Sequence, residues 1–126
     1  MAMKILAVFL GGAFGSVGRY GVYLLFENKM HVQKFWATLS VNILGSFLIG
    51  VFWAILAGNK SANTWQLLLM TGFLGGFTTF SAFSLDVLEL FRGGEIKQAL
   101  LYIAISLIGS LVMVFCAYYL VKWIRG

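Results

Sequence analysis

The chain has 126 residues, of which 61% are hydrophobic, 17% aromatic and only 10% charged. A soluble domain of this length could not bury so much apolar surface, because small domains leave a large share of their surface exposed. The composition therefore predicts one integral membrane domain, 1–126. The net charge of +5 does not indicate nucleic-acid binding, since the Lys and Arg residues are scattered at the ends of apolar segments, as at membrane interfaces.

Four apolar segments are separated by short polar connections, at 4–26, 35–58, 64–91 and 97–123. Each is long enough to cross a bilayer as a helix. We therefore expect an all-α membrane protein with four transmembrane helices.

Positive charges are balanced between the two sides that these four spans define. One side carries Lys4, Lys60, Lys122 and Arg125, and the other carries Lys29, Lys34, Arg92 and Lys97. Positive charge normally fixes orientation, so this balance favours insertion both ways and an antiparallel, dual-topology homodimer. The alternative is that the balance is accidental and a weaker signal fixes the topology.

Small residues recur at helical spacing in the first two segments. Gly11, Gly15 and Gly18 are four and three residues apart, and Ser46 and Gly50 are four apart. Such patches let helix backbones approach closely.

The third segment contains the stretch TGFLGGFTTFSAFS at 71–84. Gly75 and Gly76 each cost about 1 kcal/mol of helix propensity relative to Ala, and Thr78 and Thr79 can bond locally to the backbone. The segment is also longer than one span needs. We expect two half-helices with a break near mid-membrane, a usual place for an ion site.

Three rows of polar side chains run along the spans at helical spacing. They are Thr38, Asn42 and Ser46; Tyr102, Ser106 and Ser110; and Thr78, Ser81 and Ser84. A polar group at membrane depth is costly unless it faces protein or water. The alternatives are hydroxyls bonded to their own helices, and Asn42 as a link between helices.

The rows, together with Arg19 and the absence of an acid in the first two spans, favour a route for an anion. The alternative for Arg19 is a side chain that reaches the nearby interface. Phe80 and Phe83 share a helical face beside the third row. Core packing is the simpler role for both, although their electropositive ring edges could also face an anion.

Three motifs in the chain closely resemble those of the Fluc (CrcB-type) fluoride channel family, over its whole length. They are GGAFGSVGRY at 11–20, NILGSFLIG at 42–50 and GFLGGFTTFSAFS at 72–84. The resemblance implies an antiparallel dimer with two fluoride pores, each lined by both subunits.

The resemblance also implies roles for individual residues. Asn42 and the ring edges of Phe80 and Phe83 would contact fluoride, and the backbone carbonyls of Gly75 and Thr78 from both subunits would hold a central structural Na⁺. The remaining residues of the fluoride pathway would be Thr38, Ser81, Ser84, Tyr102, Ser106, Ser110 and Arg19. Two residues depart from the family pattern: Ala82 replaces a Thr, and Asp86 replaces a Glu.

We therefore expect a passive fluoride channel of the inner (plasma) membrane, which exports the anion and lowers cytoplasmic fluoride. We expect no enzyme, since no Ser lies in a nucleophile elbow. One alternative is a small multidrug-resistance-type, proton-coupled transporter, which needs a carboxylate in the first span where this chain has none. The other is a membrane subunit without transport activity.

Overall fold

The computed structural model describes residues 1–30, 33–60 and 63–126, with the backbone alone at residue 30. The expected connections 27–34 and 59–63 therefore lie partly outside the described residues. In the described ranges the protein is all helical, with four stretches long and apolar enough to cross a membrane. They are Ala2–Lys29, Lys34–Leu56, Asn63–Arg92 and Ile96–Arg125. The prediction of four spanning helices is confirmed.

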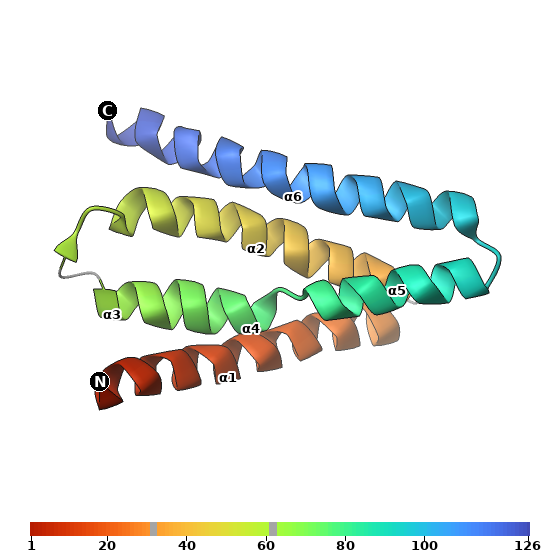
Figure 1. Ribbon diagram of the computed structural model, residues 1–126, viewed down its shortest axis with the longest axis horizontal. Helices are drawn as coiled ribbons and strands as arrows, with labels where there is room; N and C mark the ends of the chain where they lie inside the picture. Colours follow the sequence, from red (N-terminus) through yellow and green to blue (C-terminus); the bar gives the residue numbers. More distant parts are fainter. Residues whose placement is uncertain (31–32, 61–62) are drawn as a thin grey trace.

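The described elements form a bundle in which both chain termini lie at the same end (Figure 1). In chain order, the elements are α1 (Ala2–Leu25), η1 (Phe26–Met30), α2 (Lys34–Leu56), α3 (Asn63–Gln66), η3 (Leu67–Leu74), α4 (Gly75–Phe77), α5 (Phe80–Arg92) and α6 (Ile96–Arg125). The elements η1 and η3 are π-helices, and the others are α-helices. The principal contacts are those of α2 with α6 and of α1 with η3 and α4.

Glycines bring α1 into backbone contact with η3 and α4. A Cβ atom at Gly11 would clash with the carbonyl oxygen of Leu68, and one at Gly15 would clash with that of Phe73. From the other side, a Cβ at Gly76 would lie 2.6 Å from the carbonyl oxygen of Gly12. The expected role of the first-segment glycines in close packing is confirmed for Gly11 and Gly15.

Gly50 plays the same part between α2 and α6. A Cβ at Gly50 would lie 2.5 Å from the carbonyl oxygen of Val114 and 2.9 Å from the Cβ of Ala117. Gly18 differs, since its nearest neighbours are ring atoms of Phe77 at ordinary contact distances of 3.6 and 3.8 Å. A glycine is therefore sterically required at position 50 and not at position 18.

The α-helical backbone of the third segment is interrupted at Thr78 and Thr79, which have extended conformations (φ −87°, ψ 159° and φ −154°, ψ 124°). Gly75 is helical, with φ −61° and ψ −36°, and so is Gly76. Of the four residues that indicated a break, the two Thr form it and the two Gly remain helical. Close packing of Gly76 on α1 keeps that turn helical and outweighs its poor propensity.

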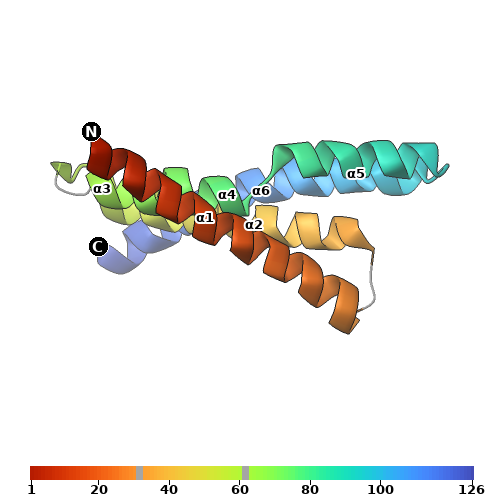
Figure 2. The same ribbon diagram turned by 90° about the horizontal axis from the view of Figure 1, so that it is seen from below.

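The interruption redirects the chain from one neighbour to another. Before it, η3 and α4 pack on α1; after it, α5 packs on α6 and α2. Figure 2 shows α5 and the C-terminal half of α1 diverging beyond this point. The two halves of the third segment therefore border different parts of the bundle, and the extended residues lie where these parts meet.

Large apolar side chains cover the outside of the bundle. Phe14 is 70% exposed, Ile108 63% and Phe115 61%. Exposed apolar surface of this extent marks contact with lipid or with another protein chain.

The glycine contacts predict the effect of one added methyl group. In Gly15→Ala the new Cβ would meet backbone atoms of Phe73, which cannot rotate away, so we expect a loss of about 1–3 kcal/mol of stability. Gly21→Ala is the matched control, because no atom lies within 4 Å of its Cβ position. Thermal unfolding in detergent measures both, and equal midpoints would contradict the packing role of Gly15.

Candidate functional site

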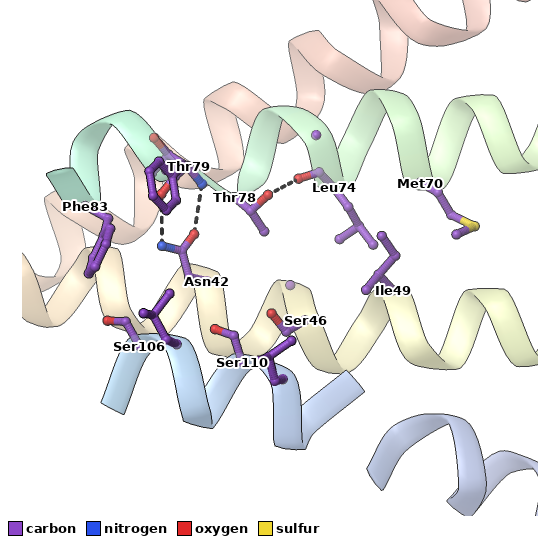
Figure 3. A pocket seen from close by; sticks show the side chains of 15 residues that line it. Asn42, Ser46, Ile49, Met70, Leu74, Thr78, Thr79, Phe83, Ser106 and Ser110 are labelled. Atoms are coloured by element: carbon purple, nitrogen blue, oxygen red, sulfur yellow. Dashed lines mark hydrogen bonds between the residues drawn. The ribbon is translucent and has the colours of Figure 1, made fainter. Parts of the chain in front are cut away.

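A cavity of about 440 Å³ lies between α2, α6 and the interruption of the third segment (Figure 3). Side chains from all three helical segments line it, and they include Asn42, Ser46, Thr78, Phe83, Ser106 and Ser110. No Asp, Glu, Lys or Arg is among the described residues that line this cavity. Its polar groups are thus a neutral amide, hydroxyls and backbone.

Both polar atoms of the Asn42 side chain form hydrogen bonds with the backbone of one residue of the interruption, Thr79. Its Nδ2 donates to the carbonyl oxygen of Thr79 at 2.9 Å, and its Oδ1 accepts from the Thr79 N–H at 2.8 Å (Figure 3). A side-chain amide has two N–H hydrogens. One of them bonds to Thr79, so the other can serve a ligand in the cavity that Asn42 lines.

This pairing changes the bonding of two backbone carbonyls. In a continuous α-helix the N–H of residue i+4 donates to the carbonyl of residue i. The Thr79 N–H, which would serve Gly75, donates to Asn42 instead. The Ala82 N–H, which would serve Thr78, donates to the Thr79 hydroxyl at 3.1 Å and caps α5. The two carbonyls predicted to hold sodium, those of Gly75 and Thr78, have therefore both lost their helical donors.

Two Ser of the fourth segment, Ser106 and Ser110, line the cavity. Ser106 is 5% exposed, and its Oγ has no hydrogen-bond partner in the described structure. Ser110 lies one turn further along α6, and Ser46 of α2 lies nearby (Figure 3). A buried hydroxyl without a partner is costly, so the Ser106 hydroxyl is the cavity's clearest open site for a polar ligand.

Thr38 and Tyr102 do not line the cavity, although each makes a polar contact close to it. Thr38 is fully buried, and its Oγ1 lies 2.9 Å from the hydroxyl of Tyr23. Tyr102 donates to Asp86 Oδ2 at 3.0 Å. The structure therefore places these two predicted pathway residues in hydroxyl contacts between helices.

Phe80 and Phe83 both line the cavity but differ in burial. Phe83 is 7% exposed and packs in a core cluster with Phe35 and Tyr102, with its ring centroid 5.1 Å from that of Tyr102. Phe80 is 72% exposed, and its centroid lies 5.4 Å from that of Phe83. In this single chain, core packing describes Phe83 and does not describe Phe80.

A second recess, of about 460 Å³, lies on the other side of the interruption and is positively charged. Arg19 of α1 and Lys34 of α2 line it together with Tyr23, Ser81 and Thr79. Thr79 lines both recesses. The predicted Arg19 is thus brought close to the polar interruption, with Lys34 as a second cation.

Two hydroxyls of the predicted third row bond to their own helix. Thr78 Oγ1 donates to the carbonyl oxygen of Leu74 at 2.8 Å, and Ser84 Oγ donates to that of Phe80 at 2.9 Å. Ser84 lines neither recess. The structure therefore does not bring Thr78, Ser81 and Ser84 together as one row of free hydroxyls.

Comparison with known sequences identifies the family. The profile of the family described as "CrcB-like protein, Camphor Resistance (CrcB)" matches residues 6–118. The chain belongs to the CrcB-like family.

Three relatives of this CrcB-like chain carry the name "Fluoride-specific ion channel FluC". The protein of Serratia proteamaculans is 44% identical over 100% of this chain and 99% of its own length. That of Thermus thermophilus is 44% identical over 91% of this chain and 92% of its own. That of Rhizobium etli strain CIAT 652 is 52% identical over 79% and 80%. The family and the four spans make the chain a multi-pass membrane protein, of the plasma membrane in bacteria.

Sequence reasoning on this CrcB-like chain missed the role of Thr79, which lines both recesses, and the burial of Asp86, which bonds to Tyr102. Thr79 was noted only as part of the break. Thr is a preferred N-cap residue, and Thr79 directly precedes α5 and accepts from the Ala82 N–H. Asp86 was noted only as a departure from the family pattern. It is 2% exposed, and its Oδ1 has no hydrogen-bond partner in the described structure. The available signal was an acid within an apolar run, which at membrane depth indicates a functional position.

The two-point pairing of Asn42 predicts a local structural effect of its removal. In Asn42→Ala, the Thr79 N–H loses its acceptor and the Thr79 carbonyl loses one of its donors, so we expect a loss of about 1–3 kcal/mol and faster amide exchange around residues 78–82. Hydrogen–deuterium exchange with mass spectrometry measures this. Ser40→Ala is the control, because that exposed hydroxyl bonds only to its own helix at Trp36; equal exchange in both variants would contradict the role of Asn42.

Proposed function

We propose that this chain is a passive fluoride channel and not an enzyme. The relatives' shared name supports the fluoride assignment. The structural observation that carries the proposal is the neutral polar cavity beside the interruption, with open donors at Asn42 and Ser106. Neutral donors compensate an anion for lost water without the full positive charge that would trap it.

The pathway that we propose begins at the recess lined by Arg19 and Lys34. Their charges raise the local concentration of anions. The anion then passes Thr79 and enters the cavity, where the second N–H of Asn42 and the hydroxyls of Ser106 and Ser110 replace water. Thr38 and Tyr102 support this wall through their contacts with Tyr23 and Asp86.

Phe80 and Phe83 would contribute their ring edges to the same pathway. An aromatic ring is electropositive at its edge, and both rings line the cavity. Phe80 is largely exposed in the single chain. A ring that lines a closed pore would be covered by protein, so this exposure supports a second chain that packs against Phe80.

We propose that the complete channel is an antiparallel, dual-topology dimer in which the interruption lies near mid-membrane. The balanced Lys and Arg count of the two sides supports insertion in both orientations. An interruption at that depth requires polar partners for its backbone, and Asn42 is such a partner. The two pores would each be lined by both subunits.

The carbonyls of Gly75 and Thr78, from both subunits, would hold a structural Na⁺ at the dimer axis. Their oxygens fit this role because their helical donors bond to Asn42 and to the Thr79 hydroxyl. When bound, the ion would supply positive charge that stabilises carbonyls of two facing chains. The residues of this chain free those carbonyls and fix their position.

Fluoride that enters a cell as neutral HF dissociates in the cytoplasm, and the negative interior drives the anion outward through such a channel. The family match favours this function over a small multidrug-resistance-type transporter. The first helix also lacks the acid that proton coupling would need, since Ala2–Leu25 contains no Asp or Glu.

Purified protein in liposomes is expected to release fluoride and to retain chloride. The cavity's small neutral donors suit a compact anion that accepts strong hydrogen bonds. Ion-selective electrodes measure both effluxes under the same voltage. Equal release of fluoride and chloride would contradict the proposed selectivity, and protein-free liposomes are the control for leakage.

Two variants test the pore residues in the same assay. Asn42→Asp places a negative charge in the cavity, so we expect fluoride flux to fall more than about tenfold. Phe80→Ile removes a ring edge, and we expect a fall of about tenfold. Phe115→Ile, at an exposed position of α6, is the matched control and keeps its flux. Unchanged flux in both pore variants, with the dimer intact by size-exclusion chromatography, would return these residues to packing roles.

Sodium is expected to stabilise the dimer against heat. At constant ionic strength, raising Na⁺ to about a hundredfold excess over its dissociation constant adds about 2.7 kcal/mol. Thermal unfolding followed by chromatography of the dimer measures this, with N-methylglucamine as the replacing cation. The same midpoint in both cations would contradict the Na⁺ site and leave the fluoride assignment unaffected.

A further inference from the structure

A recess of about 650 Å³ lies at the end of the bundle that holds both termini, and it gathers cations. Lys60 comes from the second connection, and Lys122 and Arg125 come from the last turn of α6. The C-terminal end of α2, at Ala54 and Ile55, forms another wall. Figure 1 shows this end of α6 next to the end of α2.

Two of these cations contact neutral groups of the described chain. Arg125 Nη1 donates to the carbonyl oxygen of Ala54 at 3.4 Å, which leaves most of the guanidinium N–H groups for another partner. Lys122 Nζ lies 5.7 Å from the ring centroid of Tyr118. No Asp or Glu is among the described residues that line the recess. Its positive charge is therefore available to an anion.

Apolar surface adjoins the charged recess. Ile55 lines it and is 47% exposed, and next to Lys122 and Arg125 on α6 stand Trp123 and Ile124, which are 80% and 68% exposed. The ends of membrane-spanning helices lie at the level of the lipid headgroups. Cations that have exposed apolar side chains beside them on the same helix end match a phospholipid, which joins a phosphate to acyl chains.

We propose that this recess binds the phosphate of an anionic phospholipid headgroup. Arg and Lys form charge-assisted hydrogen bonds with phosphate oxygens, and basic pockets between transmembrane helices are known to suit such headgroups. The simpler alternative is that each cation reaches the interface independently. The position of Lys60 favours a shared binding site over independent cations. It comes from a different part of the chain from Lys122 and Arg125, yet all three line one recess.

The test compares two triple variants that remove the same amount of charge. K60Q/K122Q/R125Q neutralises the recess, whereas K29Q/R92Q/K97Q neutralises exposed cations of the first and third connections, on the other side of the spans. Each protein is mixed with limiting phosphatidylglycerol in phosphatidylcholine micelles, and native mass spectrometry counts the lipids retained. Retention of phosphatidylglycerol is expected to fall about fivefold for each cation removed from the recess. The control triple retains it like the parent protein.

Three outcomes would overturn the proposal. Equal losses in the two triples would mean general attraction to a charged surface. Equal retention of phosphatidylcholine and phosphatidylglycerol by the parent protein would exclude recognition of an anionic lipid. Displacement of the lipid by the same concentration of inorganic phosphate would assign the recess to a free anion.

Folding does not limit this test. Thermal unfolding is measured for each variant, and Lys60→Gln alone changes one exposed side chain outside the spanning helices. That single variant is expected to retain phosphatidylglycerol about fivefold less well than the parent, and unchanged retention would contradict the proposal. The readout is independent of fluoride flux, so failure here leaves the channel function untouched.

Discussion

The pairing of Asn42 with the backbone of Thr79 is the interaction on which the rest of the site depends. Within an apolar bundle, the Thr79 N–H has no helical acceptor and would be costly to leave unpaired. The Asn42 amide accepts from this N–H and also donates to the Thr79 carbonyl, which begins α5 as its N-cap. The helix of the third segment can therefore end at Phe77 and begin again at Phe80 without leaving the Thr79 N–H unpaired.

Close backbone packing provides the rigid frame for that interruption. Gly11 and Gly15 let η3 lie directly on α1, and Gly50 lets α2 lie directly on α6. These contacts fix the first half of the third segment and the helix that carries Asn42. Beyond the interruption, α5 turns to α6 and α2, and the cavity forms between the frame and the redirected helix.

Much of the fold could be predicted from local sequence. Hydropathy indicated the four spans, because a bilayer demands long apolar runs, and spacing indicated the close contacts of Gly11 and Gly15, though not those of Gly18. The position of the interruption could not be derived from propensity. The poorest helix formers, Gly75 and Gly76, remain helical because tertiary packing overrides propensity there.

The sequence indicated which types of polar residue the site contains, but it did not indicate their hydrogen-bond partners. The polar rows drew attention to Asn42, Ser106 and Ser110, and these three residues line one cavity; their part in an anion route stays a prediction. No periodicity could pair Asn42 with Thr79, since those residues are 37 positions apart and belong to different segments. Hydroxyls are harder still, because the same Ser or Thr can bond to its own helix, as Ser84 does, or remain open, as Ser106 does.

The position of Thr79 between the two recesses has an electrical consequence for the proposed channel. This one residue lines both recesses, and each recess is wide enough for several water molecules. In the proposed channel, water in the two recesses would carry the membrane voltage inward from both sides and concentrate the field between them. An ion that passes Thr79 would then move through most of the potential in one step, at about 2.3 kcal/mol per charge for each 100 mV.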